Sequence, residues 1–251
     1  MNYSINIAKI DQPSLPYTLE DESPEELKQL LRVEQVKAIP EATKKLCTIP
    51  DRRAYRSMSR SAVLLSSVGL NLKKEIDPFI ESNAASVGIY CAVQNGPDSY
   101  FSVAKVLEHE KTDSFHKTYK RFRSPKHYLK QLPNLAPGQL GIFLNAQGPT
   151  HTYTHSRYGV LHAVQRARHD LVSKRIEVAL ICSAFAFEDP IALHYYKNHL
   201  QHNQVLCEGA AAILVTDSSK LPQKEELYKW EASEFYGISN PLIHYVKEYL
   251  L

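Results

Sequence analysis

The stretch from Gly138 to Asp189 constrains the fold of this chain more than any other part of the sequence. An apolar segment leads to a Gly-Pro turn at Gly148-Pro149, and a short alternating run from Thr150 to Thr154 follows it. A helix-patterned segment comes next, and the apolar run from Val178 to Cys182 then indicates a buried strand. This order of helix, strand, tight turn, helix and strand is typical of α/β proteins, in which helices cover a sheet.

The turn near Ser156-Arg157 joins the alternating run to the helix-patterned segment. In α/β enzymes such a strand-to-helix turn often carries a nucleophile, because a helix N-terminus stabilises negative charge. Here the position is Arg157, and a helix N-terminus disfavours a guanidinium by ~0.3–1 kcal/mol. We therefore expect this side chain to point away from the helix dipole or to pair with an anion.

The chain as a whole has the composition of a soluble globular protein. It has 251 residues, of which 43% are hydrophobic and 23% charged. The net charge of +3 is too small to indicate nucleic-acid binding. Apolar runs are strand-length, so no transmembrane helix is expected, and the N-terminus lacks the features of a signal peptide. The four cysteines are widely spaced and form no CxxC pair, so we expect reduced thiols and a cytoplasmic location.

Further elements are predicted from periodicity and capping signals. An opening strand is expected at Ser4 to Lys9, a helix starting at Ser23-Pro24, a helix capped by Ser57 or Ser59 and interrupted near Gly69 to Asn71, a buried strand within Asn83 to Val93, a helix at Ile191 to Leu200, a strand at Leu206 to Val215, a strand around Leu227 to Ala232, and a closing helix at Pro241 to Leu251.

The segment from Phe115 to Lys130 is strongly basic. It has no acidic residue, and three aromatic residues are interleaved with its basic ones, which are Lys117, Lys120, Arg121, Arg123, Lys126 and Lys130. Three interpretations remain open: a solvated face near a subunit interface, a surface for an acidic protein partner, and a nucleic-acid surface without a recognised motif.

Four parts of the sequence together resemble the N-terminal half of a β-ketoacyl synthase, the condensing enzyme of fatty-acid and polyketide assembly. They are Arg56 to Arg60 before an Ala- and Leu-rich helix, Ser124-Pro125 through Gly148-Pro149, the nine-residue step from Gly148 to Arg157 with His162 and Ala163 beyond it, and Cys207 to Val215. The likeness covers roughly Met1 to Asp217. It implies an α/β fold, the N-terminal half of a thiolase-like protein, with a mixed five-stranded sheet covered by helices. It also implies a single domain over residues 1–251 with a short C-terminal strand and helix extension at about 218–251.

Two departures from the family bear on activity. Arg157 stands where the family has its nucleophilic cysteine, and a guanidinium cannot form a thioester. A shift of one residue would place Ser156 there, a poor substitute in thioester exchange. The family's histidine motifs, His-Gly-Thr-Gly-Thr and the Asn-Ser-Phe-Gly type, have no counterpart in this sequence. Condensation needs a thiolate and groups that stabilise the enolate and oxyanion, so we expect no catalytic residue, no cofactor and no metal.

The resemblance instead implies a partner role. Ketosynthases dimerise through the strand that leads from the Gly-Pro turn to the active cysteine. The corresponding residues are Pro149, Thr150, His151, Thr152, Tyr153 and Thr154, whose alternating pattern suits an intersubunit ladder. A catalytically silent subunit, the chain-length factor, pairs with an active ketosynthase in type II polyketide systems. A shortened version accompanies a ketosynthase in bacterial aryl polyene biosynthesis, and this sequence looks most like that version. The resemblance implies a heterodimer with an active synthase, and the basic residues Lys117, Lys120, Arg121 and Arg123 are the candidate surface for an acidic acyl carrier protein.

Other interpretations follow from individual residues. Ser156 or Cys182 would be the nucleophile of an acyl-thioester hydrolase or acyltransferase, but no Gly-x-Ser-x-Gly elbow is present and Cys182 lies within an apolar run. His151 and His155 are four residues apart, a spacing that a metal site uses on a helix, yet no carboxylate falls at ligand spacing. A free-standing acyl-binding module on the same fold is the remaining alternative.

Overall fold

The computed structural model describes residues 1–8, 36–39, 49–50, 52–55, 57–94, 107–109, 114–122, 125–155, 157–229 and 231–251. The predicted helix at Ser23-Pro24 lies outside these residues. A five-stranded sheet forms the centre, with the strand order β1-β7-β5-β3-β4. Its strands are β1 (Asn2–Ile7), β3 (Val87–Val93), β4 (Thr150–Tyr153), β5 (Val178–Phe185) and β7 (Gly209–Val215). The predicted α/β fold with a mixed five-stranded sheet is therefore confirmed.

The sheet is mixed because its two halves run differently. β4, β3 and β5 are parallel, whereas β7 is antiparallel to both β5 and β1. Every residue of β3, β5 and β7 is buried, as expected for strands covered on both faces. β4 and β1 are the two edge strands.

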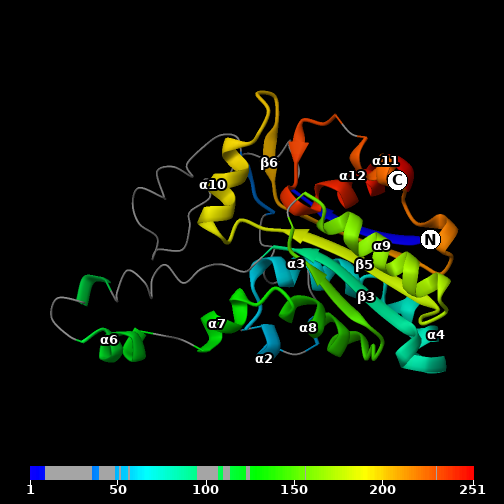
Figure 1. Cartoon of the computed structure of the whole chain (residues 1–251), viewed down its shortest axis with the longest axis horizontal. Helices are drawn as coiled ribbons and strands as arrows, with labels where there is room; N and C mark the ends of the chain where they lie inside the picture. The colour runs from blue at the N-terminus through cyan, green and yellow to red at the C-terminus, as the bar shows by residue number, and fades with distance from the viewer. Residues whose placement is uncertain are drawn as a thin grey trace.

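Helices cover both faces of the sheet (Figure 1). α3 (Arg60–Leu70), α4 (Lys73–Asn83) and α8 (Leu135–Leu144) lie on one face, and α9 (Gly159–Val172), α11 (Lys224–Tyr228) and α12 (Asn240–Tyr249) lie on the other. The remaining helical segments are α2 (Arg52–Tyr55), η1 (Ala84–Ser86), α6 (Phe115–Phe122), α7 (Pro125–Gln131), α10 (Pro190–Asn198), η2 (Ser218–Lys220) and η3 (Gly237–Ser239). In the described part of the chain, no helix combines the length and apolar character that a membrane crossing needs.

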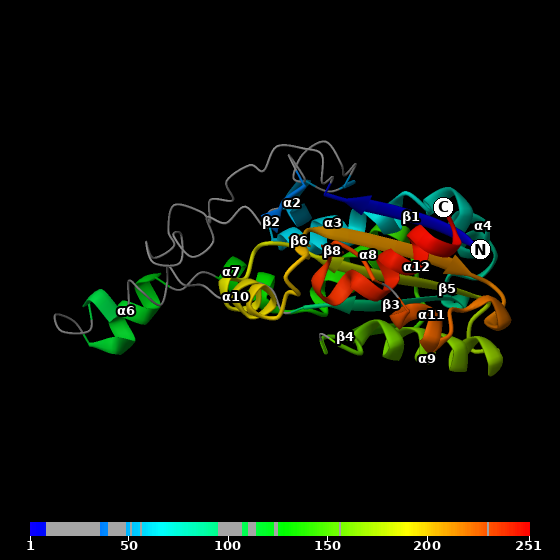
Figure 2. The ribbon, with the colours of Figure 1, turned by 90° about the horizontal axis from the view of Figure 1, so that it is seen from above.

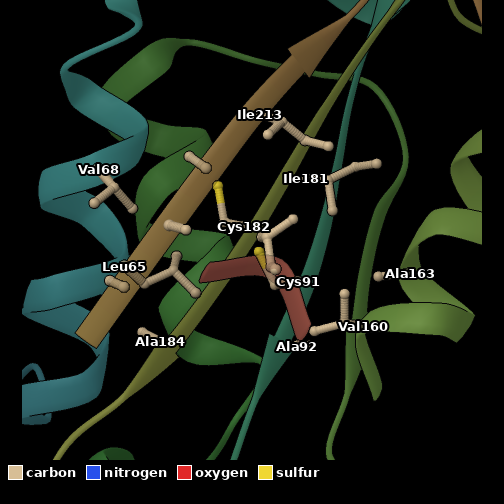
Figure 3. Close-up of a cluster of buried hydrophobic side chains, with 14 of the residues drawn as sticks. Leu65, Val68, Cys91, Ala92, Val160, Ala163, Ile181, Cys182, Ala184 and Ile213 are labelled. Carbon is tan, nitrogen blue, oxygen red and sulfur yellow. The ribbon is translucent and has the colours of Figure 1, made fainter. Parts of the chain in front are cut away.

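The core lies on both sides of β3 and β5. Leu65 and Val68 of α3 pack from one side, and Val160 and Ala163 of α9 pack from the other (Figure 3). Cys91 of β3 stands opposite Cys182 of β5 in the parallel ladder. Both thiols are free and fully buried, whereas Cys47 lies outside the described residues.

Most predicted elements are confirmed. β3 and β4 form at the predicted places, and α10 and α12 match the predicted late helices. The opening strand β1 forms as well, but it begins two residues earlier than predicted, at Asn2, and ends at Ile7. Ser59 caps α3 by accepting a hydrogen bond from Ala62 N at 3.2 Å. α3 ends at Leu70, so the interruption expected near Gly69 to Asn71 is confirmed as well.

Two predictions in the last quarter of the chain are wrong. The expected strand at Leu206 to Val215 is two strands, because β6 (Val205–Cys207) ends before Glu208 and β7 begins after it. β6 belongs to a separate three-stranded parallel sheet, between β2 (Val36–Lys37) and β8 (Glu234–Phe235). The strand expected around Leu227 to Ala232 does not form as predicted, because Leu227 and Tyr228 lie in α11, whose start is stabilised by a capping box of Gln223 and Glu226.

Candidate functional site

β4 is an open edge of the central sheet. It pairs with β3 on one side, and no described strand pairs with it on the other. Gly148 brings the chain to this edge: a Cβ there would lie 2.2 Å from the carbonyl oxygen of Val87 and 2.8 Å from that of Ala85. Only glycine fits such a close backbone approach. None of the six predicted interface residues from Pro149 to Thr154 is buried, so their side chains are accessible to a second chain.

The N-terminus of α9 follows β4 directly. The Arg157 side chain is exposed, and its guanidinium carbon lies 5.4 Å from the centre of the Tyr158 ring. In the part of the chain that the structure describes, Arg157 makes no ion pair. A cation over an aromatic face is a favourable contact. Arg157 thus faces solvent and does not fill a pocket, while Ser156 lies outside the described residues.

His155 accepts hydrogen bonds from the first backbone N–H groups of this helix. Its ring Nδ1 accepts from Tyr158 N at 3.3 Å, and its carbonyl oxygen accepts from Gly159 N at 2.7 Å. These N–H groups are the ones that a helix N-terminus offers to an anion. Both are satisfied within the chain, so this turn does not present these two donors to a substrate.

The C-terminal part of the chain packs against the same turn. Tyr228 donates a hydrogen bond from its hydroxyl to Arg157 O at 2.6 Å, and burial raises the pKa of Tyr228 to about 12. Ile238 of η3 is 1% exposed, and its Cδ1 lies 3.3 Å from where a Gly159 Cβ would be. An acyl chain that approached α9 from this side would have to displace Ile238.

A buried carboxylate lies beneath the sheet edge. Asp170 of α9 is fully buried, and it accepts a hydrogen bond from the Tyr90 hydroxyl at 2.8 Å and from Arg166 Nε at 3.1 Å. His169 Nδ1 lies 3.2 Å away from it. Burial by itself would raise the pKa of Asp170, but hydrogen bonds from Tyr90 and His169 and the charge of Arg166 lower it below its ordinary value. Asp170 therefore remains ionised and ties α9 to β3.

His151 of β4 lies beside this carboxylate. Its ring stacks on Tyr90 with centroids 5.5 Å apart, and its Nε2 lies 3.9 Å from Asp170 Oδ2. Burial and the nearby Arg166 lower the pKa of His151, and Asp170 opposes them. His151 and His155 are engaged in different contacts, and among the described residues no three His, Cys, Asp or Glu side chains converge on a metal position.

A second ionic network joins the two sheets at Glu208. Arg60 donates from Nε to Glu208 Oε1 at 2.7 Å and from its terminal nitrogen to Oε2 at 2.6 Å. Phe187 N and Ile39 N donate to the same carboxylate at 2.7 and 2.8 Å. A fully buried carboxylate needs such partners. This explains why the strand breaks at Glu208, and why Arg60 occurs at the start of α3.

The basic segment lies at one end of the molecule, on α6 and α7 (Figure 2). Lys117, Lys120 and Arg121 are exposed on α6, while Arg123 lies outside the described residues. Phe115 and Tyr119 are 60% and 46% exposed, and their rings stack with centroids 5.8 Å apart. Exposed aromatic rings beside cations favour a binding surface over a simple solvated face.

Comparison with known proteins supports the fold. No protein-family model and no curated protein matches the chain. Among solved structures, it is similar to the ishigamide ketosynthase/chain length factor, with 19% identity, 74% of this chain and 51% of that chain covered, and a TM-score of 0.51. A structure of a type II PKS acyl-carrier protein in complex with its ketosynthase bound to the hexaketide gives 14% identity, 73% and 54% coverage, and a TM-score of 0.57.

A third similar structure is a β-ketoacyl synthase from Burkholderia phymatum, with 14% identity, 71% and 47% coverage, and a TM-score of 0.51. The chain spans about half the length of these three solved chains. The similarity read from the sequence is confirmed at the level of the fold: the chain has the thiolase-like fold of ketosynthases and chain length factors.

Proposed function

We propose that the chain is a non-catalytic, chain-length-factor-like subunit that forms a heterodimer with an active β-ketoacyl-ACP synthase. In this role it supports the synthase's interface and acyl tunnel during polyketide or fatty-acid-type chain elongation. The observation that carries the proposal is the turn before α9, where His155 accepts hydrogen bonds from the first helix amides. By the sequence resemblance, Arg157 of this turn corresponds to the family's nucleophilic cysteine. The open β4 edge beside it offers the ladder for a partner strand. The partner synthase, the acyl carrier protein and the cytoplasm as location all follow from this proposal. Bacterial aryl polyene biosynthesis as the pathway rests on the sequence resemblance alone.

Co-expression with candidate synthases tests the pairing. The backbone N–H of Thr152 allows a substitution that tests whether β4 is the joining strand. Ile89 N donates to Pro149 O at 2.9 Å, so in the parallel ladder His151 and Tyr153 point their N–H groups toward β3. The Thr152 N–H then points away from β3, toward the open edge of the sheet. Thr152→Pro removes this outward donor and leaves the β3 ladder intact, as edge strands tolerate.

We expect the wild-type chain to co-purify with its synthase and Thr152→Pro to reduce the yield of complex at least tenfold. Thr152→Val, which keeps the N–H and a β-branched side chain, should pair like the wild type. A wild-type chain that stays monomeric with every candidate synthase would refute the proposal. Equal yields from Thr152→Pro and Thr152→Val would show that β4 is not the joining strand.

An acyl-thioester hydrolase is the alternative from the enzyme class. Cys182 lies fully buried within β5, where no substrate reaches it. Thioester hydrolysis by the purified chain that is lost in Ser156→Ala would favour that alternative. A free-standing acyl-binding module would bind acyl groups without any synthase.

A further inference from the structure

Positive charge is concentrated around α9. The stretch from residue 157 to residue 175 contains five Lys and Arg and a single acid, Asp170, which gives it a net charge of +4. The whole chain has a net charge of +3. The net positive charge of this short stretch is therefore larger than that of the whole chain.

The one acid of this stretch does not reach the surface. Asp170 is fully buried against Tyr90. The exposed side chains of α9 are His162, Gln165, His169 and Val172, and none is a carboxylate. Val172 is 66% exposed and lies in a shallow, open depression lined by Gln165, Arg168, His169, Val172 and Ser173. Near its C-terminal end, the outer face of α9 thus has an exposed apolar side chain with Arg168 and His169 beside it.

Two arginines of α9, of which Arg168 lines the depression, are held in position by the fold. Arg166 Nε is fixed by Asp170 at 3.1 Å. Arg168 donates to Leu221 O and Pro222 O, each at 3.2 Å, and to Gln223 Oε1 at 3.2 Å. A guanidinium that is already immobilised loses less entropy when a carboxylate binds beside it than a mobile lysine on an open helix does.

The face also continues toward the open sheet edge. The ring of Tyr153 on β4 lies 6.0 Å from the ring of His162 on α9, and the Tyr158 ring lies 6.4 Å from His162 on the other side. A protein bound along α9 would therefore lie next to the strand through which the synthase is proposed to pair.

We propose that the outer face of α9 binds an acidic helix of a partner protein, with acyl carrier protein as the partner class. The exposed Val172 would contact an apolar side chain of that helix. The charges of Arg166 and Arg168, together with that of Arg175 just beyond α9, whose side chain is 56% exposed, would face its carboxylates. The inference rests on the proposed function, since it adds the outer face of α9 to the carrier surface of the same subunit.

Binding of a purified holo acyl carrier protein to the full-length chain, measured by surface plasmon resonance at two salt concentrations, tests the assignment. The α9 variant is Gln165→Glu with Val172→Glu, because both side chains are exposed. The matched control is Ser82→Glu with His202→Glu, which adds the same two charges at exposed positions of other segments. A third variant, Lys117→Glu with Lys120→Glu, changes α6. Equal melting temperatures establish that each variant is folded.

We expect the α9 variant to bind at least fivefold more weakly, with a larger loss at low salt, and the control to stay within twofold of the wild type. The same loss in both the α9 and α6 variants would also support α9 as part of the surface. A loss in the α6 variant alone, or no carrier binding by the wild type, would overturn the inference. Loss of the co-purified synthase from the α9 variant, with carrier binding unchanged, would overturn it too, because the synthase would then be the occupant. Pairing with the synthase is measured independently by co-expression, so a negative result for carrier binding to α9 does not contradict the proposed pairing.

Discussion

Glu188 is a carboxylate at the N-terminus of α3. It accepts hydrogen bonds from the backbone N–H groups of Arg60 and Ser61 and from the Ser61 hydroxyl. Burial raises the pKa of Glu188 to about 7, and the charge of Glu208 adds to that rise, although the hydrogen bonds oppose it. Because its ordinary pKa is 4.5, the folded chain binds this proton more tightly than the unfolded chain does.

The sign of the pH effect follows from that difference. The stabilising contribution of protonated Glu188 is fully present below pH 4.5 and is lost as the pH rises to about 7. We expect Glu188→Gln to remove this pH-dependent loss of stability, which is on the order of 1–3 kcal/mol in the free energy of unfolding. Urea unfolding of both proteins at pH 5 and pH 7.5 measures it. If the difference between the two proteins is the same at both pH values, Glu188 does not titrate in this range.

Single residues differ in how far the sequence reveals their roles. A cap at Ser57 or Ser59 is predictable because capping depends on the next three residues, and the structure shows that Ser59 is the cap. The place of Arg157 at the strand-to-helix turn is predictable because its spacing from Gly148 is local. The contacts of Tyr228 and Ile238 with this turn join residues about seventy positions apart or more. No local pattern indicates them. The partners of Asp170 were also missed, although a single acid in a basic stretch is a signal that could have drawn attention to it.

A substitution at Gly148 tests the role of the turn that positions β4 at the edge of the sheet. Gly148→Ala would place a methyl group 2.2 Å from the Val87 carbonyl oxygen, a backbone atom that cannot move away without disturbing β3. We expect a loss of about 2–4 kcal/mol in the free energy of unfolding, together with loss of synthase pairing.

Gly138→Ala is the matched control for this change. A Cβ at Gly138 would meet no atom within 4 Å, and the residue lies inside α8. Alanine should stabilise that helix by about 0.5–1 kcal/mol. Urea denaturation of the two variants gives the comparison, and equal stabilities would contradict the account of the Gly-Pro turn.

At the scale of elements, buried strands and capped helices were predictable and sheet membership was not. β3 and β5 are continuous apolar runs, which periodicity detects. The run at Leu206 to Val215 looked equally continuous, but Glu208 divides it between two sheets because its charge is paired with Arg60, 148 positions earlier. The basic composition of residues 157–175 was equally visible, yet only the fold shows which face of α9 is exposed.

On the scale of the whole molecule, we propose that residues 218–251 are part of a single domain and not a separable extension. Leu242, Ile243 and Val246 of α12 are each 0% exposed. Burial of three such side chains contributes about 5–8 kcal/mol, which is comparable with the entire stability of a typical domain.

A chain that ends at Asp217 should therefore be insoluble or unfold without a cooperative transition. A chain that lacks only Leu251, which is 74% exposed, should unfold like the full-length protein. Soluble expression and thermal melts of the two chains decide the matter. A cooperative melt from the shorter chain would show that the first 217 residues fold without α12.

Cys91 and Cys182 lie against each other at the middle of the central sheet, and burial raises the pKa of the Cys91 thiol well above its ordinary range. A thiol in this state reacts with an alkylating reagent only after the strands and their covering helices have separated. The rate of alkylation would thus report how often the whole sheet opens. A synthase that binds β4 should slow the alkylation of both thiols without contacting either sulfur.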